Sequence, residues 1–176
     1  MPVSIMPTPP ITLRAATSAD HGALRAFDAR LIAEASLPGA TRDDFIRFQR
    51  NFTDKALADI NPDSRLIVAC DAAGVVCGYI HLQPIHDEVL DQAIGYVSII
   101  AVSENAGGQG IGRKLMQAAE DWAREMNYPA IVLDVFASNE TARRFYEKAG
   151  YGEDSLRLRK EIERPTLGVL PSVRID

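Results

Sequence analysis

Four glycines within six residues form the part of this sequence best suited to bind an anion. The segment is Gly107-Gly108-Gln109-Gly110-Ile111-Gly112, and it lies between an apolar, β-branched stretch and an amphipathic one. Glycine permits a positive φ and lets a ligand approach the main chain closely. The first turn of a helix carries unpaired N–H groups and the positive end of the helix dipole. The segment therefore predicts a phosphate or pyrophosphate site at the start of a helix.

The spacing of these glycines narrows the class of ligand. A dinucleotide site needs G-x-G-x-x-G with an acid about 20 residues on, and a Walker site needs Gly-Lys-Ser/Thr. The chain has neither pattern, because its glycines are spaced G-x-G-x-G. A flexible turn whose glycines serve only tight packing is the alternative for this segment taken alone.

Asn139 and Tyr146 form a second candidate group. They are seven residues apart in one predicted short helix, about two helical turns, so both can face the same side. A positioned phenol can donate a proton to a leaving group. Each residue also has a structural alternative, because Asn139 is a good helix N-cap and Tyr146 lies beside Phe145, where an aromatic can close the edge of a core.

Asp134 is the candidate base. It interrupts the apolar run from Ile131 to Phe136, where an unpaired buried carboxylate would be costly. A carboxylate, directly or through water, can take a proton from a reacting group. The alternative is an aspartate at the exposed end of a strand, bonded to loop amides. We expect His81 and His86 to be structural or surface histidines, and Glu88 and Asp91 to lie in a solvated loop.

The motifs and their order along the chain resemble those of the GCN5-related N-acetyltransferase (GNAT) family. The resemblance covers roughly residues 65 to 152. It rests on these segments: Val97 to Val102, Gly108 to Gly112, Leu133-Asp134-Val135, Asn139, Ala142, Phe145-Tyr146 and Gly150-Tyr151. The family's loop is usually Arg/Gln-x-x-Gly-x-Gly/Ala. Gly110 and Gly112 match its glycines, whereas Gly107 stands where Arg or Gln is common. Main-chain amides do most of the binding in that loop, so the resemblance implies that binding survives this departure.

The resemblance implies an enzyme that takes acetyl-coenzyme A (acetyl-CoA) as co-substrate and uses no metal. The strand before the loop would splay from its neighbour, and an N–H near Ile100 or Val102 would stabilise the oxyanion. Tyr146 would be the general acid for the leaving thiolate. The residues implied in binding acetyl-CoA are Ile100, Ala101, Val102, Gly107, Gly108, Gln109, Gly110, Ile111, Gly112, Arg113, Asn139 and Tyr146.

The resemblance also bears on the base. Some relatives carry a Glu on the strand before the glycine loop, near the position of Tyr96 in this chain. Peptide N-terminal acetyltransferases of the RimI type have a Glu where Asp134 stands, five residues before Asn139. This favours Asp134 as the base and tilts the expected acceptor toward a peptide N-terminus.

Periodicity predicts the elements that must position these residues. In chain order we expect a strand at 11–15, helices at 18–35 and 41–58, strands at 66–70 and 75–82, a loop at 84–92, a strand at 95–102, a helix from the glycine segment to 126, a strand at 130–136, a helix at 139–149 and a last strand near 156–162. This order predicts an α/β (α+β) fold of the GNAT type, with a mixed, mostly antiparallel sheet of about six to seven strands and helices on both faces. We expect flexible tails at 1–10 and 165–176 around a single N-acetyltransferase domain at 11–164.

Composition excludes several other classes of protein. The chain has 176 residues and a net charge of −5, which argues against nucleic-acid binding. No apolar run approaches the roughly 18 residues of a membrane span, and the proline-rich start is not a secretory signal. The two cysteines, Cys70 and Cys77, match no zinc or redox motif and are expected as small apolar residues on neighbouring strands. So few cysteines favour a reducing compartment, and we expect a cytoplasmic protein.

Three functions follow from these motifs. The first is direct transfer of acetyl from acetyl-CoA to a primary amine on a small molecule, a peptide or protein N-terminus, or a lysine. The second is a non-catalytic acyl-CoA sensor that keeps the loop and needs no base. The third is a nucleotide-phosphate enzyme that uses the same turn. A homodimer is left open.

Overall fold

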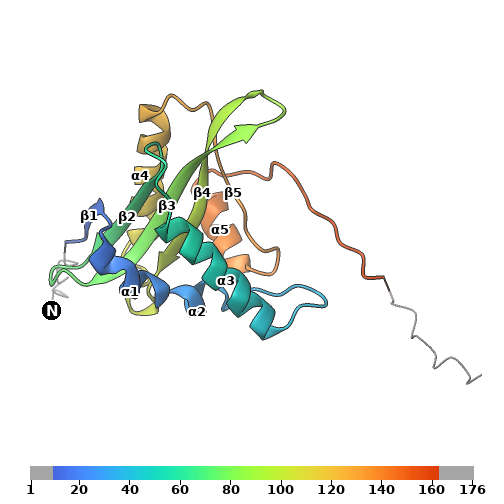
Figure 1. Cartoon of the computed structure of the whole chain (residues 1–176), viewed down its shortest axis with the longest axis horizontal. Coiled ribbons are helices and arrows are strands. Elements are labelled where there is room, and N and C mark those ends of the chain that lie inside the picture. The colour runs from blue at the N-terminus through green and yellow to red at the C-terminus, as the bar shows by residue number, and fades with distance from the viewer. Residues whose placement is uncertain (1–9, 163–176) are drawn as a thin grey trace, which may run out of the picture.

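A computed structural model describes residues 10–162 and contains a five-stranded sheet in the order β1-β2-β3-β4-β5 (Figure 1). The strands are β1 (Thr12–Ala15), β2 (Arg65–Cys70), β3 (Val76–Asp87), β4 (Gln92–Val102) and β5 (Ile131–Leu133). Neighbouring strands are antiparallel except β4 and β5, which are parallel. The predicted α/β class and the mixed, mostly antiparallel sheet are therefore confirmed. The predicted tails lie almost wholly outside the described residues.

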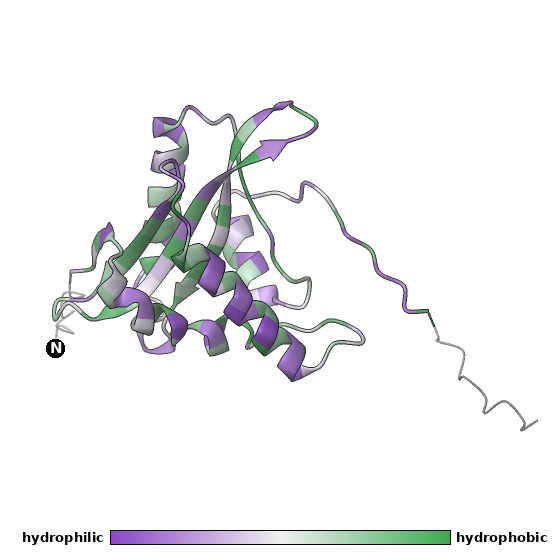
Figure 2. Cartoon of the chain, in the orientation of Figure 1, coloured by the Kyte–Doolittle hydropathy of each residue, from purple (hydrophilic) through white to green (hydrophobic). Residues whose placement is uncertain are grey.

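Helices cover both faces of the sheet, as predicted. One face carries η1 (Ser18–Asp20), α1 (His21–Arg25), α2 (Asp28–Leu31) and α3 (Arg42–Leu57). The other face carries α4 (Ile111–Glu125), and α5 (Glu140–Lys148) packs beside α4. A short 3-10 helix, η2 (Glu104–Ala106), links β4 to the glycine segment. Leu24 and Phe27 pack on Tyr79 in one core, whereas Ile111 and Leu115 pack in the other. Figure 2 shows hydrophobic residues concentrated along the strands between these layers, while the outer side of α3 is mostly hydrophilic.

The predicted helix at 18–35 is wrong as one element, because it is broken into η1, α1 and α2. The helix tightens where α1 ends: the Phe27 N–H donates to the Leu24 carbonyl, three residues back, at 3.1 Å. This turn lets the Phe27 ring reach Tyr79, with 5.4 Å between ring centroids. Packing against the sheet therefore overrides the helical pattern of the sequence.

The predicted loop at 84–92 is also wrong, because β3 and β4 extend through most of it as a hairpin. Arg65, the first residue of β2, lies opposite Leu82, so β3 has no partner on that side beyond Leu82 and is an edge strand there. Pro84 is tolerated there because an edge strand has no neighbour to receive the N–H that proline lacks. The turn is closed by Asp87, whose Oδ1 accepts hydrogen bonds from the N–H groups of Val89 and Leu90, each at 2.8 Å.

The predicted last strand near 156–162 does not form, and within residues 10–162 the sheet has five strands rather than six or seven. Leu156, Leu158 and Ile162 are 73%, 90% and 77% exposed. Figure 1 shows this segment running away from the sheet. Alternation of apolar and charged residues favours a strand only where a partner strand and an apolar surface are in reach, and this segment meets neither.

Close packing of α4 on the sheet makes Gly78 a sensitive position. A Cβ at Gly78 would lie 2.8 Å from the Ala101 carbonyl oxygen and 3.2 Å from Cγ2 of Ile111. Overpacking costs about 1–3 kcal/mol, so we expect Gly78→Ala to lower the free energy of unfolding by that amount in urea denaturation. Gly22→Ala is the matched control, since a Cβ there meets no atom within 4 Å. Equal stability of Gly78→Ala and wild type would contradict this packing.

Candidate active site

β4 loses its partner on one side halfway along its length. Its parallel pairing with β5 ends where Val97 lies opposite Leu133. β5 stops at that residue, but β4 continues to Val102. Residues 98–102 therefore have an edge on which no strand is paired in the described part of the chain. A ligand with amide groups can bond to such an edge much as a strand does.

A β-bulge lies where the two strands part. His81 of β3 is opposite Ile99, and Leu82 is opposite Val97, so Ser98 is an extra residue in β4. A bulge bends its strand and re-aims the side chains that follow it. Here it also changes which main-chain groups of β4 face the open edge.

The direction of the main-chain groups can be read from hydrogen bonds on either side of the bulge. Before it, the Gly95 N–H donates toward β5 at 2.9 Å; after it, the Ser103 N–H donates to a β3 carbonyl at 2.9 Å. Main-chain groups alternate along an extended strand. The N–H groups of Ile100 and Val102 therefore face the open edge, whereas that of Ala101 faces β3.

The glycine segment forms a left-handed turn into α4. Gly108 and Gly110 have φ of +77° and +74°, a conformation in which other residues are strained, whereas Gly107 does not require glycine for its φ of −58°. Gly110 is the N-cap of α4 and supplies no side-chain cap. Lys114 donates the first helical hydrogen bond, to the Gly110 carbonyl at 3.0 Å.

The first turn of α4 is consequently open. The N–H groups of Ile111, Gly112 and Arg113 meet no protein acceptor in the described part of the chain. Three such donors at the positive end of a 15-residue helix suit an anion. A Cβ at Gly112 would lie 3.2 Å from Cζ of Phe145, so this glycine serves the packing of α5 against α4. Gln109 is half-buried beside the turn.

Asn139 caps α5. Its Oδ1 accepts a hydrogen bond from the Ala142 N–H at 3.0 Å. Asn139 therefore does act as a helix N-cap, the structural alternative expected from the sequence, and this cap fixes where α5 begins. The side-chain amide nitrogen has no protein acceptor among residues 10–162.

Tyr146 lies on the same helix between two aromatic rings. Its ring centroid is 5.3 Å from that of Phe145 and 6.0 Å from that of Tyr151. Burial, together with the nearby Tyr151 hydroxyl, raises the pKa of Tyr146 to about 12. The phenol is therefore protonated at neutral pH and can act as an acid.

Asp134 and Tyr96 meet at the point where β4 and β5 part. The Tyr96 hydroxyl donates to Oδ2 of Asp134 at 2.9 Å. Burial, and then this hydrogen bond to Asp134, raise the pKa of the Tyr96 phenol. Asp134 is exposed just beyond the end of β5. The residue lies at the strand's exposed end, as the alternative interpretation expected, but it is bonded to a phenol rather than to loop amides.

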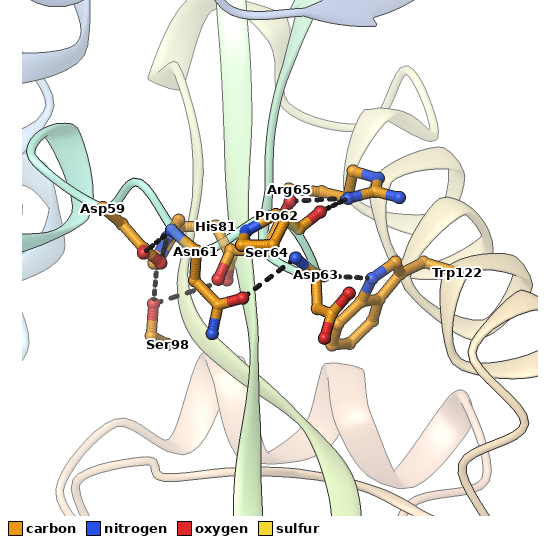
Figure 3. A network of polar contacts seen from close by, with 9 residues as sticks. All are labelled: Asp59, Asn61, Pro62, Asp63, Ser64, Arg65, His81, Ser98 and Trp122. Carbon is orange, nitrogen blue, oxygen red and sulfur yellow. Dashed lines mark hydrogen bonds and ion pairs between the residues drawn. The ribbon is translucent and has the colours of Figure 1, made fainter.

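A buried histidine, His81, lies nearby; the sequence predicts it only as a structural or surface residue, and the structure shows it buried. His81 contacts Asp59 through Nε2 at 3.0 Å and Ser98 through Nδ1 at 2.5 Å (Figure 3). The ring is 2% exposed. Its one signal in the sequence is a polar residue inside the apolar run of β3. The sequence gives no sign that Asp59 and Ser98 contact His81, because both are distant from it along the chain.

Other candidates lie away from this region. His86, Glu88 and Asp91 are exposed near the tip of the β3–β4 hairpin, where His86 Nε2 is 3.3 Å from Asp91 Oδ1. Across residues 10–162, no three His, Cys, Asp or Glu side chains gather as a metal site. In the same range, no helix is long and apolar enough to span a membrane. Cys70 and Cys77 are free and buried on neighbouring strands, as predicted.

Comparison with known proteins gives a consistent set of relatives. The model of the acetyltransferase (GNAT) family matches residues 30–151. The uncharacterised N-acetyltransferase YdgE of Bacillus subtilis is 30% identical over 84 residues, 48% of this chain and 51% of the relative. N-alpha-acetyltransferase 30 of Schizosaccharomyces pombe is 39% identical over 57 residues, 32% of this chain and 38% of the relative. The chain thus spans about half or less of the length of these two curated relatives.

The fold is shared with solved structures. A candidate acetyl transferase from Pyrococcus furiosus superposes with a TM-score of 0.72 over 87% of this chain and 100% of the other, at 24% identity. The family match spans more than half of the chain and includes the open edge of β4, the glycine turn and α5. The chain therefore belongs to the acetyltransferase (GNAT) family.

Proposed function

We propose that this acetyltransferase moves an acetyl group from acetyl-CoA to a primary amine by direct attack. The observation that carries the proposal is the open first turn of α4 beside the unpaired edge of β4. The turn offers three N–H donors to a pyrophosphate, and the N–H groups of Ile100 and Val102 suit the amide-bearing arm of coenzyme A. These residues fit the co-substrate without the Arg or Gln that relatives carry at the position of Gly107.

Two side chains are proposed for the chemistry. Tyr146 is the general acid, since its protonated phenol can neutralise the leaving thiolate. Asp134 is the carboxylate that faces the amine: it is exposed at the parting of β4 and β5, where it can hold an ammonium by charge and accept its proton. The Ile100 or Val102 N–H would stabilise the charge that develops on the carbonyl oxygen.

We propose a peptide N-terminus as the acceptor class. The S. pombe relative is named as an N-alpha-acetyltransferase. The Asp134 side of the site also has an aromatic wall, because Phe136 contacts Phe45 and Phe48 with ring centroids 5.5 and 6.3 Å apart. Phe48 remains 48% exposed. Such a wall favours an amine that carries apolar side chains close by. Two free cysteines fit a reducing compartment, and we propose the cytoplasm.

A thiol-release assay with acetyl-CoA tests the proposal. The panel should hold peptides with apolar or acidic first residues, a lysine side chain, a polyamine and an aminoglycoside. We expect coenzyme A release to depend on an added amine and to be fastest with apolar peptide N-termini. Tight binding of acetyl-CoA with no release across the panel would reject the enzyme and favour the acyl-CoA sensor. Binding of NAD or ATP in preference to coenzyme A in calorimetry would instead favour a nucleotide-phosphate enzyme.

A further inference from the structure

A chain of hydrogen bonds runs from the end of α3, across β3, to the bulge in β4 (Figure 3). Asp59 Oδ2 contacts His81 Nε2 at 3.0 Å, and His81 Nδ1 contacts the Ser98 hydroxyl at 2.5 Å. Asp59 is held from its other side, since its Oδ1 accepts the Asn61 N–H at 2.9 Å. Carboxylate, imidazole and hydroxyl in this order form a path along which a proton can move.

The charges of the groups set the direction of this path. Burial lowers the pKa of His81 despite the nearby Asp59, so the ring is neutral at neutral pH. Burial acts to raise the pKa of Asp59, but the hydrogen bond from the Asn61 N–H and the contact with His81 help to outweigh it, so the pKa is lowered and Asp59 stays ionised. We therefore assign the ring hydrogen to Nε2, which donates to Asp59, and Nδ1 accepts from Ser98.

The Ser98 hydroxyl has one other acceptor within reach, the His81 carbonyl at 3.4 Å. The contact with Nδ1 is much shorter, so the hydroxyl hydrogen points to the ring. The oxygen lone pairs of Ser98 are then free to receive a proton from outside. Among the described residues, Asp59 is the charged group that shifts the pKa of the His81 ring, and Ser98 contacts the opposite side of the ring from β4.

The position of Ser98 connects this path to the site. It is the extra residue of the bulge and the first residue of β4 beyond the pairing with β5. It is half-buried, whereas the ring of His81 is 2% exposed. Of the two residues, Ser98 is therefore the more accessible to a ligand in the gap between β4 and β5. Ser98 also precedes by two residues the Ile100 N–H that faces the open edge.

We propose that Ser98, backed by His81 and Asp59, takes the proton of the acceptor ammonium in place of Asp134, whose part is then to hold the ammonium by charge; this inference rests on the proposed acetyl transfer. The N–H bond of the ammonium breaks as a new O–H bond forms on Ser98, and the original hydroxyl hydrogen passes to Nδ1 of His81. The amine is left neutral with its lone pair free, and the imidazolium faces the Asp59 carboxylate. No redox partner is needed, because only one proton moves.

This role divides the work between two carboxylates. Oδ2 of Asp134 is already engaged by the Tyr96 hydroxyl, and its charge lies in the open where it can attract an ammonium. Asp59 lies behind the ring, where it can stabilise an imidazolium but cannot reach the amine.

Replacing His81 by Gln tests the path, because Gln keeps polar contacts but accepts no proton. With a peptide amine at pH 7 we expect kcat/KM to fall about 100-fold. Wild-type kcat/KM should change little above the lowered pKa of His81. In His81→Gln it should climb with pH until the free α-amine is neutral, near pH 7.7–8.0. With hydroxylamine, which is already neutral at pH 7, the loss should disappear, and the KM for acetyl-CoA should not change.

Matched variants separate proton transfer from folding. Ser98→Ala should show the same amine-dependent loss, and Ser98→Thr should restore most of the rate. Asn61→Ala disturbs the same turn, where Asn61 accepts the Asp63 N–H at 2.9 Å, but leaves the ring bonded (Figure 3). It should keep the wild-type pH profile. If His81→Gln does not fold, Ser98→Ala carries the test, because it removes one oxygen at a half-buried position.

Three results would overturn the inference. One is a wild-type pH profile in His81→Gln and Ser98→Ala, which leaves Asp134 as the base. Another is an equal loss with hydroxylamine and peptides, which is the mark of a structural role. The third is an acetyl adduct on Ser98 in intact mass spectra after mixing with acetyl-CoA alone, which would make Ser98 a nucleophile. Absence of thiol release in the wild type would instead reject the proposed function, and ¹⁵N NMR would still report whether His81 is neutral with its hydrogen on Nε2.

Discussion

Tyr146→Phe is expected to lower kcat about 100-fold or more while leaving the affinity for acetyl-CoA unchanged. The variant removes the phenol hydroxyl and keeps the ring that packs between Phe145 and Tyr151. General acid catalysis by a positioned side chain contributes about 10²–10⁴-fold. Steady-state thiol release gives kcat, and calorimetry with coenzyme A gives the affinity.

The pKa of Tyr146 determines how this loss should vary with pH. An acid must be protonated to act, and the Tyr146 phenol stays protonated below its raised pKa of about 12. We therefore expect no alkaline decline from Tyr146 between pH 6 and 10, and a loss in Tyr146→Phe that is constant over that range.

Tyr151→Phe is the matched control for Tyr146→Phe. The Tyr151 hydroxyl is buried and has no hydrogen-bond partner among the residues that the structure describes, so its removal should leave kcat unchanged and should not reduce the melting temperature. Equal turnover of Tyr146→Phe and wild type with the same amine would show that Tyr146 is only a packing residue.

Gly110→Asp is expected to weaken coenzyme A binding about 100-fold without unfolding the protein. The new carboxylate would stand at the N-cap of α4, beside three N–H groups that have no acceptor in the described part of the chain. It would cap the helix and repel the phosphates that the turn is proposed to bind. Two like charges about 4 Å apart near a surface repel by about 4 kcal/mol, so a 100-fold loss, about 2.7 kcal/mol, is within reach. Aspartate also tolerates a positive φ better than most residues.

Gly110→Asn separates charge from shape at this position. It has nearly the same size and the same tolerance of a positive φ, but no charge. Calorimetry with coenzyme A at low and high salt should show a small loss for Asn and a large one for Asp that shrinks with salt. Equal losses for both variants at every salt concentration would mean that the turn is required for its shape and not as an anion site.

The local features of the site could be predicted from the sequence because neighbouring residues produce them. The glycine turn into α4 and the Asn139 cap each depend on residues within a few positions of one another. A left-handed turn needs glycine, and a helix start needs a cap, whatever the rest of the chain does. The family resemblance rested on these same local motifs.

The errors in the predicted elements arose where distant packing decided the outcome. Pro84 and the polar residues after it indicate a loop, but the edge position of β3 allows a strand. The alternation at Leu156 and Leu158 indicates a strand, but no partner strand meets it. Backbone preferences are worth little in strands unless the sheet supplies a neighbour.

What the sequence determined by itself was the part of the site proposed to bind the co-substrate, since a glycine turn and a capped helix are built from adjacent residues. The grouping of polar residues on the proposed amine side was decided by the tertiary structure, although Asp134 itself was a candidate from the sequence. Tyr96 and Asp134 are 38 residues apart, His81 and Asp59 are 22 apart, and His81 and Ser98 are 17 apart. Only the register of β3, β4 and β5, with one bulge at Ser98, brings these polar groups to the place where the sheet opens.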